Sequence, residues 1–121
     1  MTTAAFATAL TGREEIQLTI RGRSSGRKST RPVWFVEDGE ALYLVPVKGS
    51  DSEWFKNVLV NPSITLTADG TSWTADAVPI TDPAAVRDIV EKFRAKYGAD
   101  QVKKYYTKLD VAVKVPFSVT R

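Results

Sequence analysis

The sequence predicts a mainly β (α+β) fold, a small antiparallel β-barrel of six to seven strands flanked by short helices. Two Asp-Gly pairs, Asp38-Gly39 and Asp69-Gly70, each separate two apolar segments, and Asp-Gly in this position is typical of a tight hairpin. Strands of this length would expose hydrophobic edges unless the sheet curled or closed. With 121 residues the chain has the size of one domain, so we expect 1–121 to form a single unit.

The N-terminal part is predicted to form a helix and a strand. Phe6 and Leu10 lie four residues apart among alanines in the segment 2–10, and Gly12 follows where a helix cap is expected. Over residues 15–21 apolar and polar side chains alternate, which is the period of a strand with one face in solvent.

A polar loop and a first hairpin come next. Residues 22–29 are polar and contain two glycines, which predicts a loop. The apolar segments 32–36 and 42–47 flank the first Asp-Gly pair. We therefore expect these two segments to pair as antiparallel strands.

A helix and a second hairpin are predicted in the middle of the chain. Residues 50–53, Ser-Asp-Ser-Glu, have the spacing of a capping box, and Asn-Pro at 61–62 would end a helix of two to three turns. Apolar residues alternate over 64–68 and 73–79, on either side of the second Asp-Gly pair.

The last third is predicted to be helical and to end in a strand. Asp82-Pro83 combines an N-cap residue with proline at the first helical position, and helical spacing continues to Gly98. A short helical stretch over 100–108 leads to a last strand over 111–117.

The composition excludes most kinds of catalytic site. The chain has no Cys and no His, which excludes zinc fingers, iron–sulfur clusters, disulfides, Cys nucleophiles and triads with an imidazole base. The 14 acidic residues are scattered, so we expect no metal site. No apolar run approaches the roughly 18 residues of a membrane span and no secretory signal is visible, so we expect a cytoplasmic protein.

Basic residues cluster after the first predicted strand. The formal charge of +3 is too small to indicate a nucleic-acid partner, but the segment 21–31 contains five cations and no acidic residue. The five are Arg21, Arg23, Arg27, Lys28 and Arg31. Cations mixed with glycine and serine suit a phosphate group, because it binds N–H and hydroxyl donors. A solvated basic surface loop is the alternative interpretation.

Trp34 and Phe35 are neighbours on one predicted strand and so face opposite sides of the sheet. One of them should belong to the core. The other could form the wall of a pocket for a planar heterocycle, since it follows the basic loop. The alternative is that both aromatic rings pack in the core.

Short motifs between residues 21 and 77 occur in an order that resembles a known family. They are the run 22–32, Asp-Gly at 38–39, Tyr-Leu-Val at 43–45, Lys-Gly at 48–49, Trp-Phe-Lys-Asn-Val at 54–58 and Asn-Pro-Ser-Ile-Thr-Leu at 61–66. On these motifs the chain resembles the split β-barrel flavin and deazaflavin oxidoreductases. Within that superfamily it is most similar to the deazaflavin (F420)-dependent nitroreductase and quinone reductase family.

The resemblance implies a bound redox cofactor, F420 or alternatively FMN. It implies that the phosphate and acidic tail is held by Arg23, Ser25, Gly26 and Lys48. Where the family commonly has an Arg this chain has Ser29, with Lys28 and Arg31 close by. The ring would be bordered by Pro32, Val33 and Trp34.

The activity implied is hydride transfer from the reduced deazaflavin to a small quinone, nitro compound or conjugated carbonyl. In such enzymes the cofactor carries the chemistry, and the protein orients the reactants and excludes water. The resemblance assigns no catalytic side chain. A barrel of this size buries a modest fraction of its surface, so we also expect a homodimer.

Two other functions remain open at this stage. The segment 31–36 together with Gly49-Ser50 resembles the sister branch of pyridoxamine-phosphate-oxidase-like FMN proteins. A non-catalytic barrel that binds a lipid, polyphosphate or RNA is the third alternative, because a basic helical face and three tyrosines occur over 92–108. They are Lys92, Arg94, Lys96, Lys103, Lys104 and Lys108, with Tyr97, Tyr105 and Tyr106. We interpret these as a solvated helix surface and expect no nucleic-acid partner.

Overall fold

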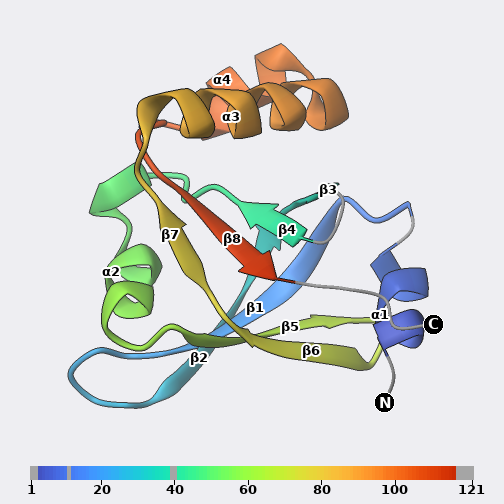
Figure 1. The fold of residues 1–121 in the computed structure, drawn as a ribbon, viewed down its shortest axis with the longest axis vertical. Coiled ribbons are helices and arrows are strands. Elements are labelled where there is room, and N and C mark those ends of the chain that lie inside the picture. The colour runs from blue at the N-terminus through green and yellow to red at the C-terminus, as the bar shows by residue number, and fades with distance from the viewer. Residues whose placement is uncertain (1–2, 11, 39–40, 117–121) are drawn as a thin grey trace.

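Eight strands and four α-helices make up the described residues 3–10, 12–38 and 41–116 of the computed structural model (Figure 1). Their order is α1 (Thr3–Leu10), β1 (Glu15–Arg21), β2 (Lys28–Trp34), β3 (Val36–Asp38), β4 (Ala41–Leu44), the 3₁₀ turn η1 (Gly49–Asp51), α2 (Glu53–Val60), β5 (Ser63–Ala68), β6 (Thr71–Asp76), β7 (Val78–Ile80), α3 (Pro83–Tyr97), α4 (Ala99–Tyr105) and β8 (Ala112–Pro116).

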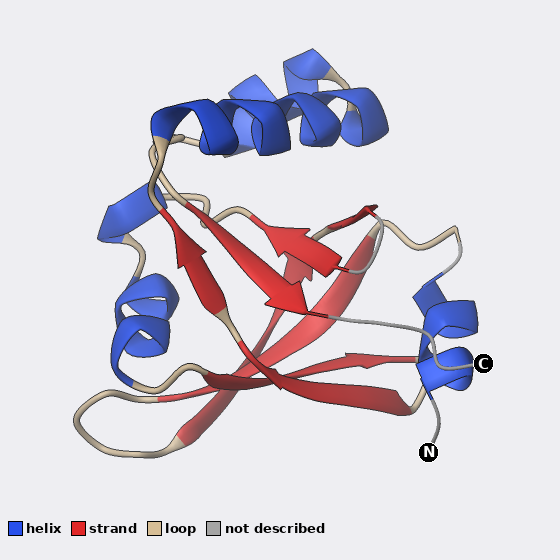
Figure 2. Ribbon diagram, viewed as in Figure 1, coloured by secondary structure: helices blue, strands red, loops and turns tan. Residues whose placement is uncertain are grey.

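The strands form two antiparallel four-stranded sheets, ordered β2-β1-β5-β6 and β3-β4-β8-β7 (Figure 2). The chain passes from one sheet to the other at Phe35, between β2 and β3, and again at Ala77, between β6 and β7. Because each break is one residue long, the strands correspond to six nearly continuous extended segments. The predicted fold class, a small antiparallel split barrel with flanking helices, is confirmed.

The second predicted hairpin is present, and the first is present in part. In the second, Asp69 (φ 49°) and Gly70 (φ 76°) are left-handed, as a two-residue turn of the I′ type requires, and they join Ala68 to its partner Thr71. In the first, Asp38 pairs with Ala41 and Val36 pairs with Tyr43. The predicted pairing of 32–36 with 42–47 is wrong for residues 32–34, which belong to β2 and pair with β1. The Gly39 of that predicted turn lies outside the described residues.

The core lies between the two sheets. Leu18, Leu42, Leu44 and Leu66 have no exposed surface. Side chains of α1 and α2, which lie on opposite sides of the barrel in Figure 1, complete the same cluster. They are Phe6 and Leu10 from α1 and Trp54, Phe55 and Val58 from α2. The predicted amphipathic helix at the N-terminus is therefore confirmed.

A second cluster lies outside the barrel, where α3 and α4 cover the sheet that contains β8 (Figure 1). Val113 and Val115 of β8 belong to the barrel core, and Ala112 packs in the outer cluster with Phe93 of α3. The outer face of β8 is covered only at its start, because Lys114, on the same face as Ala112, is exposed. None of the helices in the described part of the chain has the length and apolar character that crossing a membrane requires.

The ends of α3 are as predicted, whereas the start of α2 is not. The Asp82 carboxylate accepts a hydrogen bond from the Ala85 N–H at 3.0 Å, and Gly98 ends the helix with a φ of 97°. The capping box at 50–53 is wrong: α2 begins after Ser52, whose side chain makes no capping bond. The Ser50 hydroxyl instead donates to Asp110 from another part of the chain.

Candidate functional site

A cavity of about 850 Å³ lies between β2, the start of α2 and α4. This volume is in the usual range for a small-molecule or cofactor site. Five of the nine residues predicted to bind a cofactor line it, namely Arg31, Pro32, Val33, Trp34 and Lys48. The fold thus brings part of the predicted site together around one space.

Arg31 is on the inward face of β2. It pairs with Leu18 across the sheet, and Ser29 pairs with Ile20, so both side chains share the face of these core residues. The Arg31 Nε is buried and has no hydrogen-bond partner in the described part of the chain. Leaving a buried N–H unpaired costs free energy, so this atom suits an acceptor oxygen supplied from the cavity.

Trp34 and Phe35 agree with the first of the two interpretations, in which one ring is in the core and the other lines a pocket. Phe35 is 2% exposed in the core, whereas Trp34 is half-buried and lines the cavity. The Trp34 ring stacks on Tyr97, with centroids 4.2 Å apart and planes 8° from parallel. Tyr105 meets it edge-on at 5.6 Å, and Tyr106 lies at 5.8 Å.

These three tyrosines were missed as site residues by the sequence interpretation. It placed them on a solvated helix surface, which is wrong for Tyr106, 7% exposed in the outer cluster. Tyr105 and Tyr106 line the cavity together with Trp34. Burial raises the pKa of Tyr97 to about 12 and also raises the pKa of Tyr106, so both hydroxyls stay protonated at neutral pH.

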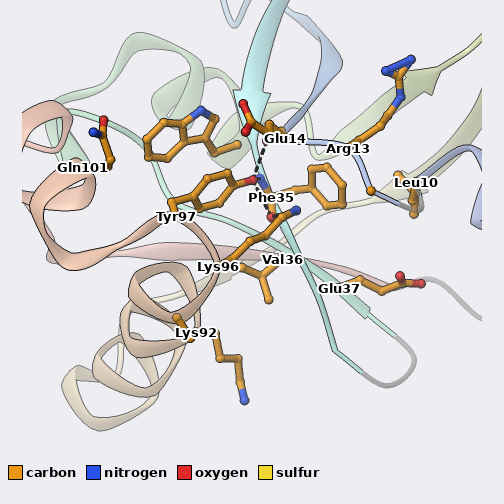
Figure 3. A pocket seen from close by; sticks show the side chains of 13 residues that line it. Leu10, Arg13, Glu14, Phe35, Val36, Glu37, Lys92, Lys96, Tyr97 and Gln101 are labelled. Carbon is orange, nitrogen blue, oxygen red and sulfur yellow. Dashed lines mark hydrogen bonds between the residues drawn. The ribbon is translucent and has the colours of Figure 1, made fainter.

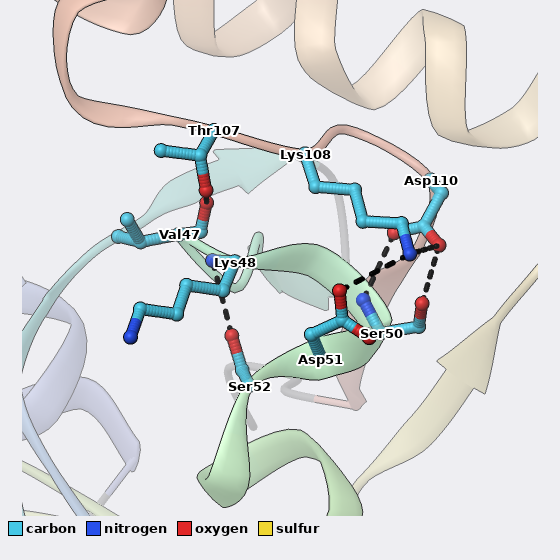
Figure 4. A network of polar contacts seen from close by, with 8 residues as sticks. All are labelled: Val47, Lys48, Ser50, Asp51, Ser52, Thr107, Lys108 and Asp110. Carbon is cyan, nitrogen blue, oxygen red and sulfur yellow. Dashed lines mark hydrogen bonds and ion pairs between the residues drawn. The ribbon is translucent and has the colours of Figure 1, made fainter.

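Lys48 lies on a turn that a polar network holds in place (Figure 4). The Lys48 N–H donates to the Ser52 hydroxyl at 3.1 Å, and the Thr107 N–H donates to the Val47 carbonyl at 2.8 Å. Asp110 accepts from the Ser50 N–H at 2.9 Å and from its hydroxyl at 2.5 Å. The Lys48 side chain extends away from this network in Figure 4, which leaves its ammonium available to the cavity that it lines.

The other four predicted residues lie outside the cavity lining. Arg23 is 2.8 Å from the Glu53 carboxylate and donates to Asn57 at 2.7 Å. Its hydrogen bond and charge lower the pKa of Glu53, a residue that does line the cavity. Arg23 therefore reaches the rim of the cavity only through Glu53.

In the loop between β1 and β2, backbone N–H groups donate hydrogen bonds to acceptors within the loop itself. The Gly26 N–H donates to the Gly22 carbonyl at 3.0 Å, and the Gly22 N–H donates to the Arg27 carbonyl at 2.9 Å. Ser25 accepts from the Arg27 N–H at 3.2 Å, and Lys28 is exposed at the start of β2. In this structure these N–H groups hydrogen-bond to acceptors within the loop.

A second cavity, of about 990 Å³, shares Glu14, Trp34 and Gln101 with the first (Figure 3). Its Lys96 ammonium donates to the Phe35 carbonyl at 2.8 Å and lies 3.5 Å from the centre of the Phe35 ring. Burial lowers the pKa of Lys96. Arg13 pairs with Asp69, and its guanidinium points away from Lys96 in Figure 3. The buried Arg13 Nε, like that of Arg31, has no hydrogen-bond partner among the described residues. Of the nine predicted residues only Trp34 lines this second cavity, so the first cavity fits the prediction better.

Comparison with solved structures places the barrel among known folds. An F420-H2-dependent reductase has a TM-score of 0.66 at 20% identity, covering 85% of this chain and 94% of that one. A protein assigned as a pyridoxamine 5′-phosphate oxidase, from Listeria innocua, has a TM-score of 0.68 at 16% identity, covering 93% and 90%. A domain-swapped dimer has a TM-score of 0.67 at 20% identity, covering 85% and 80%. Such distant matches establish the fold alone.

The sequence itself identifies the family. A search of curated proteins finds no match to the chain. The family model described as F420H2-dependent quinone reductase, however, matches residues 1–116, almost the whole chain. The resemblance inferred from the motifs between residues 21 and 77 is thereby confirmed. The chain belongs to the F420H2-dependent quinone reductase family, and it is an oxidoreductase that uses F420 as its cofactor.

Proposed function

We propose that the protein transfers a hydride from F420H2, bound in the 850 Å³ cavity, to a small quinone, nitro compound or conjugated carbonyl. The observation that carries this proposal is the buried Arg31 Nε, without a partner among the described residues, in a cavity walled by Trp34. A cationic hydrogen-bond donor and an aromatic surface in one space suit a flat ring that carries an anionic tail.

The cavity residues fit the two ends of such a cofactor. Arg31 and Lys48 would bind phosphate or carboxylate oxygens, and Pro32, Val33 and Trp34 would border the ring. Arg23, Ser25, Gly26 and Lys28 would meet only the part of the acidic tail that extends past Glu53 into solvent. This assignment uses all nine predicted residues, with the four loop residues in a peripheral role.

The chain's own residues would act by orientation and exclusion of water. When bound, F420H2 supplies the hydride, which explains how a chain without Cys or His can be an enzyme. Trp34 is half-buried, Tyr106 is buried, and both line the cavity. They would therefore keep water away from the cofactor ring. Arg31 would hold the charged tail, and with it the distance between ring and acceptor.

The test is a titration of the purified protein with F420 and, side by side, with FMN, read by absorbance and fluorescence. We expect F420 fluorescence to change at micromolar protein and FMN to bind more weakly. Arg31→Ala removes a hydrogen bond to a charged group, worth about 1.5–3 kcal/mol, and should weaken F420 binding about ten- to a hundredfold. Arg87→Ala, on the exposed side of α3, is the matched control.

Three outcomes would contradict the proposal. Tighter binding of FMN would favour a flavin protein, and no response to either cofactor would favour a non-catalytic barrel. Equal binding by the Arg31 and Arg87 variants would remove Arg31 from the site. The acceptor class is tested next, by oxidation of F420H2 with menadione, a nitroaromatic or an enone under anaerobic conditions.

A homodimer remains part of this proposal. One structure with this fold is a domain-swapped dimer. Leu59 and Val60 at the end of α2 and Val78 of β7 are 54%, 58% and 45% exposed, which is apolar surface that a second copy would bury. Light scattering coupled to size exclusion should give twice the mass of the chain, and a monomer at all concentrations would contradict it.

A further inference from the structure

The backbone directly after Trp34 is held by side chains and not by the sheet. Trp34 pairs with Glu15 at the end of β2, and pairing resumes at Val36, so Phe35 falls in the break. The Phe35 N–H donates to the Tyr97 hydroxyl at 3.1 Å. The Phe35 carbonyl is 2.9 Å from the same hydroxyl and accepts from Lys96 at 2.8 Å.

Tyr97 is tied to the barrel at a second point as well. Its hydroxyl is 2.5 Å from the Glu14 carbonyl, which precedes β1, as the dashed lines in Figure 3 show. Since Glu14 and Phe35 flank the paired residues Glu15 and Trp34, one phenol oxygen links the ends of β1 and β2. Tyr97 thereby anchors the last residue of α3 to the strand ends beside the cavity.

The same side chain covers one face of the Trp34 indole. The two rings are nearly parallel with centroids 4.2 Å apart, and Phe93 supports Tyr97 from 5.9 Å. An aromatic side chain at the end of a strand would otherwise sample several rotamers. Here the backbone beyond it and one ring face are both held by Tyr97.

We propose that Tyr97 is the positioning residue that fixes the Trp34 indole as the wall against which the cofactor ring lies. This inference rests on the proposed function for the identity of the ring, but the Tyr97–Trp34 coupling is independent of it. Tyr97 acts through Trp34 and is not a catalytic residue, since its hydroxyl is committed to backbone groups. Because the Trp34 ring is held in place before the cofactor binds, less conformational entropy is lost on binding.

The coupling can be measured without any cofactor. Labelling with 5-fluorotryptophan gives one ¹⁹F signal for each of the three tryptophans, and Trp34→Phe assigns the signal of Trp34. Tyr97→Phe keeps the stacked ring and removes the hydroxyl contacts, whereas Tyr97→Leu removes both. We expect the Trp34 signal to move or broaden slightly in the first variant and strongly in the second, while Trp54 and Trp73 stay in place.

Tyr105→Leu is the matched control for this measurement. It removes another tyrosine ring that meets Trp34, but one with an edge contact and an exposed position. We expect a smaller change of the Trp34 signal than in Tyr97→Leu. An equal or larger change would overturn the assignment of the positioning role to Tyr97.

The outcome is decisive even where a variant does not fold. If Tyr97→Leu is unfolded by circular dichroism, Tyr97→Phe decides: a displaced Trp34 signal with Trp54 and Trp73 unmoved supports the proposal. An unmoved Trp34 signal overturns it. Movement of all three signals together would also overturn it, because Tyr97 would then have only a general structural role.

Kinetics then separate positioning from binding. With F420H2 and an accepted quinone, Tyr97→Leu should lower kcat about ten- to a hundredfold, because misplacement by about 1 Å can cost this much, and should raise the KM for F420H2 only severalfold. A rise in KM alone would contradict the positioning role. If the wild-type protein binds no F420, the proposed function fails while the ¹⁹F result stands.

Discussion

Gly49 allows two distant parts of the backbone to come into direct contact. It has a φ of 56°, and a Cβ there would lie 2.1 Å from the Asp110 carboxylate and 2.8 Å from the Lys108 carbonyl. Only glycine fits both the conformation and the space. This approach seats the turn that carries Lys48 against the segment before β8.

Gly49→Ala should therefore destabilise the protein far more than Gly70→Ala. Gly70 also has a positive φ, 76°, but nothing lies within 4 Å of its Cβ position. In both variants, an alanine at a positive φ strains the backbone by about 1–2 kcal/mol. At Gly49 the steric clash adds about 1–3 kcal/mol of overpacking. Urea denaturation of both variants measures the difference, and equal losses would show that the contact at Gly49 relaxes freely.

At the scale of an element, α3 shows how a helix positions a site residue. Its first turn is capped by Asp82 and its inward residues Val86, Ile89 and Phe93 pack in the outer cluster. The helix ends at Tyr97, where Gly98 reverses the chain into α4. The positions at which α3 begins and ends therefore determine where Tyr97 contacts Trp34.

Loss of the N-cap should lower stability by a predictable amount. Asp82→Ala removes the acceptor for the Ala85 N–H and should cost about 1 kcal/mol. Asp82→Asn keeps a side-chain oxygen at the same place and should cost little. The free energy of unfolding in urea distinguishes the two, and an equal cost for both would mean that the negative charge, and not the hydrogen bond, is what matters.

Across the whole molecule, two carboxylates join parts of the chain that are far apart in sequence. Burial by itself would raise the pKa of Asp110, but hydrogen bonds from Ser50 and the charge of Lys108 outweigh it, so the pKa lies below its usual range. A hydrogen bond and the charge of Arg23 lower the pKa of Glu53. The hydrogen bonds between Ser50 and Asp110 tie η1 to the segment before β8, and the Arg23–Glu53 ion pair ties the β1–β2 loop to α2.

The stability of the protein should fall in acid because of these groups. A carboxyl group whose pKa is lower in the folded state contributes stability above its unfolded pKa, about 4, and loses it as the pH falls through the folded value. The melting temperature should therefore drop below about pH 4. Asp110→Asn should show a smaller drop between pH 7 and pH 3 than the wild type, with Asp88→Asn on exposed α3 as the control. An unchanged drop would contradict the role of Asp110.

The first strand, the second hairpin and the family could be inferred from the sequence because each depends on neighbouring residues. Alternation over 15–21, Asp-Gly at 69–70 and the Asp82 cap act within a few positions of the chain, where backbone geometry is set locally. The motifs between residues 21 and 77 identified the family because each is a short run of adjacent residues. Arg31 could be predicted as a cofactor-binding residue because it lies in a cluster of basic residues that is visible in the sequence.

What only the tertiary structure decided is how side chains far apart in sequence share one space. Asp110 competes for Ser50 from 60 positions away, so the local capping signal at 50–53 failed. Tyr97 reaches Phe35 across 62 positions, and no local pattern marks it. Arg23 pairs with Glu53 from 30 positions away, and the basic loop residues 22–28 do not line the cavity. Such contacts depend on sheet order and helix placement, which are properties of the whole chain and of no short segment of it.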